Sequence, residues 1–231
     1  MKKKILLFLT IIFFTGCTCD YNLTIDNKKR VYEDATFMDD NSNILKYDSS
    51  VQEFLYNREN EFYDYNSTRI YENDMSGLNV KRSYNSIDEY VQSSLYLRAF
   101  EKSYIVKDKD FYKFETSGQY YRNNIFSNSL ESTFKYNIDK INIKIKFYNE
   151  VISSNADEID KANNIYTWTI DKESLNESIS FQLSNKVRFD VMFKDFIYRN
   201  KITLIVICGI LVVVVFALSK LRQVMKKNNS I

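Results

Sequence analysis

The sequence of 231 residues predicts an α+β fold, with an antiparallel sheet, two or more covering helices and a single C-terminal transmembrane helix. Three observations support this fold class. Apolar and polar residues alternate in several segments, two helix-capping sequences interrupt those segments, and a charge-free apolar run lies near the C-terminus. The chain has no internal repeat and no linker rich in proline or glycine, so we expect one domain before that run.

Strict alternation is typical of strands that bury one face in an antiparallel sheet. It is strongest in KINIKIKFYN at 140–149, where the isoleucines all fall on one side. The expected strands are 20–26, 30–37, 103–107, 110–116, 140–149, 165–171 and 178–184. We expect Trp168, the only tryptophan, in the core beneath the helices. The alternative for Trp168 is the wall of a ligand pocket.

Two capping boxes predict the first turns of two helices. They read Ser50-Val51-Gln52-Glu53 and Ser86-Ile87-Asp88-Glu89, and apolar residues follow each at helical spacing. We expect both helices to cover one face of the sheet. Residues 187–197 are ambiguous, because their phenylalanines fit both an alternating strand and a helix that leads into the apolar run.

The N-terminus has the plan of a secretory signal, because three lysines precede the apolar residues Ile5–Phe14. Ten residues span about 15 Å as a helix, roughly half of a bilayer core. Phe14-Thr15-Gly16-Cys17 resembles a bacterial lipobox, although the family pattern usually has Leu at the position of Phe14. This resemblance implies a signal peptide at 1–16 and acylation of Cys17. The alternative is a simple signal peptide that leaves Cys17 and Cys19 without an assigned role.

The C-terminal apolar run predicts a transmembrane helix at 201–219. Residues 202–218 carry no charge and would span about 26 Å as a helix, enough to cross a bilayer core with little tilt. A basic tail follows at 220–231, and the positive-inside rule predicts that it is cytoplasmic. The sequence therefore predicts an extracytoplasmic domain at 17–200, facing outside the cell membrane.

Composition excludes several classes of function. Residues 20–200 contain 24 Lys/Arg against 30 Asp/Glu, a net charge of −6, so nucleic acid is not an expected partner. The chain contains no histidine, which excludes Ser-His-Asp and Cys-His nucleophiles. Its four glycines form neither a Walker loop nor a dinucleotide fingerprint. We expect no cofactor and no enzymatic activity.

One resemblance covers nearly the whole chain. The segment FYNEVISSNADEIDKANNIYTWTID at 147–171, together with the lipobox and the first expected hairpin, resembles the LppM-like domain of bacterial membrane-anchored lipoproteins. The matching elements are Ser154-Asn155-Ala156, the acidic turn at 157–160 and Tyr166-Thr167-Trp168. The family often has Pro-Gly where this chain has Asn149-Glu150. The resemblance implies an extracytoplasmic α+β domain with a capacity to bind lipid, and it implies no catalytic residues.

Two acidic clusters are candidate cation sites. Asp39, Asn41 and Asn43 have the spacing that opens a calcium loop, but the sixth and twelfth positions are Ile44 and Ser50 rather than Gly and Glu. A solvated loop is therefore favoured, and no metal site is predicted there.

The second cluster comprises Asp157, Glu158 and Asp160, which could form a weak cation site or an acid pair. A polar turn between two strands is the favoured interpretation. A hydrolase that uses only carboxylates would need two Asp or Glu residues in one cleft, with Asp157, Glu158 and Asp160 as the candidates, and it is the least favoured function.

The aromatic content of 16% has two interpretations. Phe and Tyr either build an ordinary core or line a concave sheet that accepts an apolar ligand. Our favoured hypothesis is a non-enzymatic, membrane-anchored lipoprotein whose extracytoplasmic domain binds an apolar ligand or lipid near the bilayer. The alternative is an envelope adaptor or structural protein that acts through protein–protein contacts. The sequence assigns no binding residues, biological process or oligomeric state.

Overall fold

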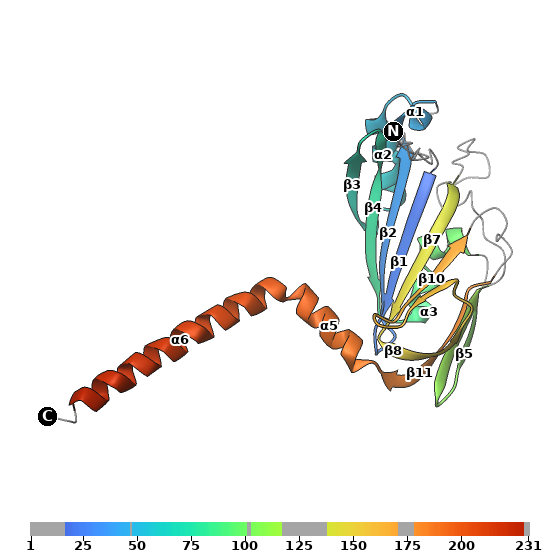
Figure 1. Ribbon diagram of the computed structural model, residues 1–231. Coiled ribbons are helices and arrows are strands. Elements are labelled where there is room, and N and C mark those ends of the chain that lie inside the picture. The colour runs from blue at the N-terminus through green and yellow to red at the C-terminus, as the bar shows by residue number, and fades with distance from the viewer. Residues whose placement is uncertain (1–16, 47, 101–102, 117–137, 171–177, 229–231) are drawn as a thin grey trace, which may run out of the picture. The chain divides into compact units, whose positions relative to one another are not determined.

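The computed structural model describes residues 17–46, 48–100, 103–116, 138–170 and 178–228. The predicted signal peptide at 1–16 lies outside the described residues. The chain divides into two compact units, the first ending at Val187 and the second comprising Arg188–Ile231. Among the described residues, the first unit contains two sheets and four short helices, and the second contains two helices (Figure 1).

The larger sheet, called the main sheet below, has seven strands in the order β3-β4-β2-β1-β7-β10-β9 (Figure 1). Its strands are β1 (Cys17–Ile25), β2 (Val31–Asp40), β3 (Asn66–Glu72), β4 (Met75–Tyr84), β7 (Ile138–Phe147), β9 (Glu158–Asp160) and β10 (Ile165–Ile170). The pairing of β1 with β7 is parallel, with Tyr21 opposite Ile143, and the other pairs are antiparallel. The expected antiparallel sheet is therefore mixed. More than 100 residues separate β1 from β7, ample for the crossover that a parallel pair needs.

A second sheet contains four antiparallel strands in the order β5-β6-β11-β8. They are β5 (Ser103–Lys107), β6 (Phe111–Thr116), β8 (Asn149–Ser154) and β11 (Ser180–Val187). Only Tyr148 separates β7 from β8, so the chain passes directly from the main sheet to the second sheet. The sequence predicts three of these strands but not their separation into a second sheet.

The helices of the first unit begin where the capping boxes predict. In α2 (Val51–Glu61), the Ser50 hydroxyl accepts a hydrogen bond from the Glu53 amide at 3.1 Å. Ser86 caps α3 (Ile87–Tyr90) in the same way. Ser93 then caps α4 (Ser94–Ala99), because its hydroxyl accepts from the Tyr96 amide at 3.2 Å, so the expected second helix is divided in two. A further short helix, α1 (Asn41–Ile44), follows β2.

The core lies between the main sheet and the elements that cover it. The predicted inward residues of the alternating strands are buried: Tyr21, Leu23, Ile25, Ile141, Ile143, Ile145, Phe147, Tyr166, Trp168, Ile170, Ile179, Phe181 and Leu183. They form one cluster with residues of the helices, including Phe54, Leu55, Ile87, Tyr90 and Leu95. Trp168 is only 4% exposed and lies in the core, as predicted.

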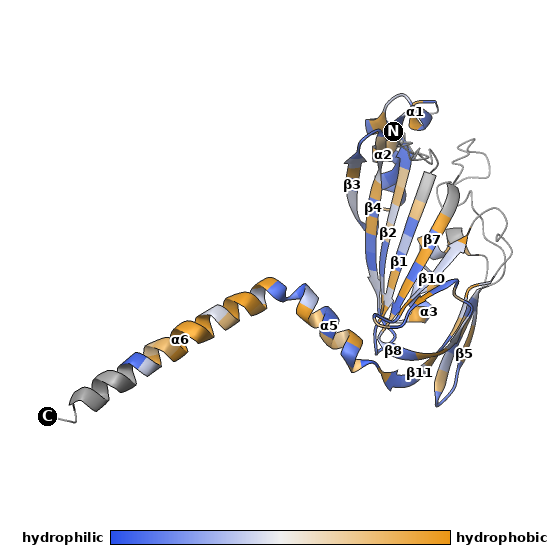
Figure 2. Ribbon diagram, viewed as in Figure 1, coloured by the Kyte–Doolittle hydropathy of each residue, from blue (hydrophilic) through white to orange (hydrophobic). Residues whose placement is uncertain are grey.

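The second unit contains α5 (Phe189–Arg199) and α6 (Lys201–Asn228). Residues 187–197, ambiguous in the sequence, are helical from Phe189. Within α6, Lys201–Lys220 is long and apolar enough to span a membrane, with a mean hydropathy of 3.1 and no buried residue (Figure 2). The expected single apolar C-terminal helix is thus present. No other helix of the described ranges meets the same criteria.

Candidate functional site

An apolar cavity lies in the first unit, between the inner faces of the two sheets and beside α3 and α4. Its walls are Leu23, Ile25, Ile87, Tyr90, Tyr96, Phe100, Phe114, Thr116, Ile143, Ile145, Ile179 and Phe181. These residues expose no polar surface to the cavity, whose volume is about 20 Å³. That volume is sufficient for about one water molecule, but an apolar wall gives water no hydrogen-bond partner.

The alternation of each strand brings these residues together. Side chains two positions apart lie on the same face of a strand, so Leu23 and Ile25 of β1 both point inward. Ile143 and Ile145 of β7 are paired with Tyr21 and Leu23 in the parallel register, which places them on that same face. The parallel pairing that the sequence did not predict therefore aligns the main-sheet wall of the cavity.

The opposite wall is built around Phe181 of β11. Its ring is stacked on Phe114 of β6, with centroids 4.9 Å apart, and lies 4.8 Å from the ring of Phe147. Trp168 lies behind it, at 6.5 Å. The indole nitrogen of Trp168 donates to Asn155 Oδ1 at 2.9 Å, which satisfies its one polar group. The ring of Phe181 therefore lies between Trp168 and the cavity, and Trp168 is not part of the cavity wall.

A buried carboxylate lies on the same face of the main sheet. Glu33 of β2 is only 2% exposed, and its two oxygens accept hydrogen bonds from the hydroxyls of Tyr21 and Tyr84. The Tyr84 bond measures 2.6 Å. The Tyr65 and Tyr84 hydroxyls lie 3.1 Å apart, and those of Tyr21 and Tyr90 lie 2.7 Å apart. Glu33 and these four tyrosines are called the tyrosine cluster below.

The electrostatics of the tyrosine cluster follow from burial. Desolvation raises the pKa of Glu33 above its usual value, while hydrogen bonds from the tyrosines and the charge of Arg82 oppose that rise. Burial and the charge of Glu33 raise the pKa of Tyr21 and Tyr90 well above the usual value. No salt bridge to Glu33 occurs among the described residues, and Arg82 pairs instead with Asp64. Hydroxyl donors and the nearby charge of Arg82, rather than a salt bridge, therefore stabilise this carboxylate.

Tyr90 connects the cavity to the tyrosine cluster. Its ring lines the cavity and lies 5.1 Å from the ring of Tyr96, while its hydroxyl meets that of Tyr21. The cavity thus has an entirely apolar interior with a hydrogen-bonded acid directly behind one wall.

Two of the three candidate calcium residues, Asp39 and Asn43, are hydrogen-bonded to each other. Asp39 is buried, and its carboxylate accepts from Asn43 Nδ2 at 3.1 and 3.2 Å. Asp40 is the N-cap of α1 and accepts from the Ser42 amide at 2.7 Å, while Asn41 is the first residue of that helix. In the parts of the chain that the structure describes, no group of three or more Cys, Asp or Glu is placed to hold a metal ion.

Carboxylates of the second acidic cluster accept hydrogen bonds from backbone amides. Asp157 accepts from the Thr169 amide at 2.7 Å, and Asp160 accepts from the amides of Ala162 and Asn163 at 3.0 and 3.1 Å. The expected polar turn is wrong for 158–160, because Glu158 and Asp160 belong to the short strand β9 that pairs with β10. Backbone pairing along β10 outweighs the polar composition of this segment.

The two N-terminal cysteines differ in position. Cys17 is the first residue of β1, and its predicted acylation stays a prediction. Cys19, two residues along the same strand, is buried, and burial raises the pKa of its thiol, with a further contribution from Asp20. A protonated thiol is a poor nucleophile, so Cys19 is an apolar core residue.

Sequence reasoning missed the tyrosine cluster. Its signal lies in RVYEDATF, where Glu33 occupies an inward position between Val31 and Ala35. A charged residue at a core position of an alternating strand is rare unless it is paired or hydrogen-bonded. That position identifies Glu33, but the partners Tyr65, Tyr84 and Tyr90 come from other elements and leave no local pattern.

Comparisons with known proteins add little to this geometry. No family model matches the chain, and no curated protein matches it. Among solved structures, the chain is similar to the folded domain of LppM from Mycobacterium tuberculosis, determined by NMR. The identity is 10%, the match covers 78% of this chain and 97% of that chain, and the TM-score is 0.49. At this level the similarity carries no argument about function, and membership in the LppM-like family stays a prediction.

Proposed function

We propose that the first unit binds an apolar ligand, the acyl chain of a lipid, in the cavity between its two sheets. The observation that carries this proposal is the composition of the wall, which exposes no polar atom although it includes tyrosine and threonine side chains. Ligand sites are typically apolar concavities close to a few polar groups, and the tyrosine cluster supplies such groups behind Tyr90.

The present cavity is too small for an acyl chain, so part of its wall must move. We assign this movement to α3 and α4, which have four and six residues. Helices this short have little intrinsic stability and depend on packing. An acyl chain that displaces Tyr96 and Phe100 would replace their apolar contacts with its own.

In this proposal the chain is a lipoprotein held by an acylated Cys17 and by α6, with the binding unit outside the cell membrane and the tail cytoplasmic. Mass spectrometry of the mature N-terminal peptide tests the acylation, and a free terminus that begins elsewhere would exclude it. Protease added to intact cells tests the orientation. It should remove the first unit and leave the basic tail intact.

Trp168 provides a direct test of ligand binding. It is the only tryptophan and contacts the cavity wall through Phe181, so a brominated acyl chain in the cavity should quench its fluorescence. The experiment uses the full chain in phosphatidylcholine nanodiscs titrated with dibromostearic acid. Saturable quenching supports the proposal.

Two substitutions on β7 provide the matched control. Ile143 lines the cavity and Ile141 does not, although both are buried on the same face of the strand. Ile143→Phe should abolish the saturable quenching, while Ile141→Phe should retain it. Quenching that is unsaturable, or unchanged in Ile143→Phe, would come from the bilayer and would overturn the proposal.

One observation favours the adaptor as a second candidate. β5 is an edge of the second sheet among the described strands, and its Tyr104 and Val106 are 61% and 50% exposed. Exposed edge strands are templates for pairing with another chain. If Trp168 shows no saturable quenching, a photo-crosslinker at Tyr104 should capture one protein that the same group at Lys109 does not.

A further inference from the structure

The apolar face of α5 is exposed. Residues three and four apart share one side of a helix, so Phe189, Phe193, Phe196 and Ile197 form a continuous face. Phe189 is 73% exposed and Phe193 is 63% exposed, and Phe196 and Ile197 are also exposed. Three adjacent phenylalanines in water are unfavourable, so this face requires an apolar partner.

The charges of α5 point to the nature of that partner. Asp190, Lys194, Asp195 and Arg199 lie away from the phenylalanines and balance one another. A hydrogen bond from Arg188 lowers the pKa of Asp190 to about 2, so its carboxylate is ionised at neutral pH. Because the helix has no excess of basic residues, attraction to anionic lipid contributes little. Burial of the phenylalanines must supply the binding energy.

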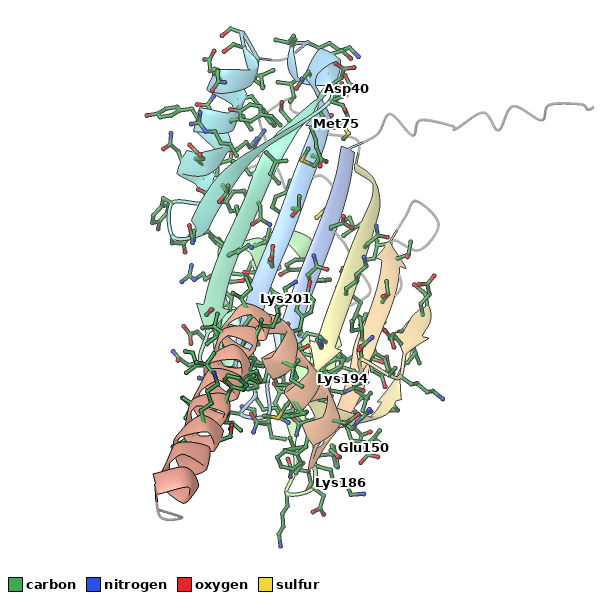
Figure 3. All side chains as sticks on the ribbon, turned by 60° about the vertical axis from the view of Figure 1, so that its left-hand side comes forward. Asp40, Met75, Glu150, Lys186, Lys194 and Lys201 are labelled. Carbon is green, nitrogen blue, oxygen red and sulfur yellow. The ribbon has the colours of Figure 1, made fainter. Side chains whose placement is uncertain are left out.

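We propose that α5 is an interfacial helix that lies on the bilayer, with its phenylalanines at the boundary between headgroups and acyl chains. The apolar partner of this face is lipid, because the apolar helix α6 begins at Lys201, only two residues after the end of α5 (Figure 3). The ring of Tyr198 lies 5.3 Å from the Lys201 ammonium, and tyrosine and lysine are typical anchors at a membrane surface.

The test places a tryptophan at neighbouring positions of α5. Phe193→Trp and Lys194→Trp are each made in a Trp168→Phe background of the full chain, reconstituted in vesicles of brominated phosphatidylcholine. The tryptophan at 193 should be quenched by the brominated lipid and shielded from aqueous iodide. The tryptophan at 194 should show the reverse. Phe196→Trp and Asp195→Trp form a second pair with the same expectation.

Two results would overturn the proposal. If iodide reaches both members of a pair equally, α5 lies in water. If both quenchers fail at position 193, protein covers the phenylalanines instead of lipid. Should Trp168→Phe not fold, the same substitutions are measured with Trp168 retained and the wild-type signal subtracted. This readout does not involve the cavity, so it is independent of the acyl-chain proposal.

Discussion

Two regions packed against the same face of the main sheet bury their residues in opposite ways. Toward β7 and β10, the cavity and its surroundings contain almost only hydrocarbon and aromatic rings. Toward β2 and β4, the tyrosine cluster buries a carboxylate among hydroxyls. The boundary between the two regions runs along β1. Tyr21 belongs to the tyrosine cluster, and Leu23, the next inward residue of the strand, lines the cavity.

The difference between the two regions concerns specificity and adaptability. A buried carboxylate must keep its donors, so the tyrosine cluster tolerates little rearrangement. Apolar contacts are non-directional, and one hydrocarbon surface can replace another at modest cost. The tyrosine cluster therefore fixes the position of Tyr90 and α3, while the apolar region can exchange side-chain contacts for those of a ligand.

The largest effect is expected from Phe181→Ala. Phe181 is buried beside the rings of Phe114, Phe147 and Trp168, so its truncation should lower the free energy of unfolding by about 3–5 kcal/mol. Urea denaturation of the full chain in detergent micelles, followed by Trp168 fluorescence, measures this loss. Ile152→Ala, at an exposed position of β8, is the control and should change stability by less than about 0.5 kcal/mol. Equal losses in both variants would show that the apolar region is not closely packed.

Glu33→Leu should have the next largest effect. Leucine removes the acceptor of two buried tyrosine hydroxyls and leaves Tyr21 and Tyr84 without their carboxylate partner. Each lost hydrogen bond to the charged carboxylate costs about 1.5–3 kcal/mol, partly offset by removal of the buried charge. Glu33→Gln keeps an acceptor and should be clearly less destabilising in the same urea experiment. If Glu33→Leu instead raised the free energy of unfolding, the buried carboxylate would destabilise the fold, and it would not be needed to hold the tyrosines in place.

The fold was largely predictable where the alternation is strict. β1, β7, β10 and β11 bury the residues that the sequence predicts because a period of two determines which side chain points inward. β4 was missed because Ser76, Gly77 and Leu78 are buried consecutively and break that period. β3 was missed because none of its residues is buried, so it has no inward apolar series. A Cβ at Gly77 would lie 1.8 Å from the Phe37 carbonyl oxygen, so close backbone approach explains this glycine.

The candidate site was predictable only in part. The sequence indicates that aromatic residues are abundant and that Trp168 is buried, but the cavity depends on pairings between distant strands, above all β1 with β7. Such pairings are determined by tertiary packing rather than by any local pattern. The partners of Glu33 come from β1, β4, α3 and the segment before β3 for the same reason.

The stability that Glu33 contributes to the folded protein depends on pH. The pKa of Glu33 is raised on folding above its usual value of 4.5, so the folded state binds a proton more tightly than the unfolded state. Its contribution to stability is fully present below pH 4.5 and is lost as the pH rises through the folded-state pKa. Arg82 and the four tyrosines are the titratable groups that face Glu33. Burial raises the pKa of each of these tyrosines above its usual value, so the tyrosines keep their protons throughout this range.

Glu33→Gln removes that titration. Relative to the variant, the wild-type protein should therefore lose free energy of unfolding between about pH 4.5 and neutral pH, by about 1.4 kcal/mol for each tenfold difference in proton affinity between the folded and unfolded states. The measurement is the difference between urea midpoints of the two proteins at a series of pH values. A difference that does not vary with pH would mean that Glu33 titrates alike in the folded and unfolded states.

The smallest effect is expected from Tyr90→Phe, at the junction of the two regions. The substitution keeps the ring that lines the cavity and packs at 5.1 Å from Tyr96, and it removes the hydroxyl that meets Tyr21 at 2.7 Å. Because Tyr21 retains its bond to Glu33, the cost should be about 0.5–1.5 kcal/mol in the urea experiment. Saturable quenching of Trp168 by dibromostearic acid should be unchanged, since the apolar wall is intact. If Tyr90→Phe weakened that quenching without unfolding the protein, the hydroxyl would take part in ligand binding, and the two regions would act as one site.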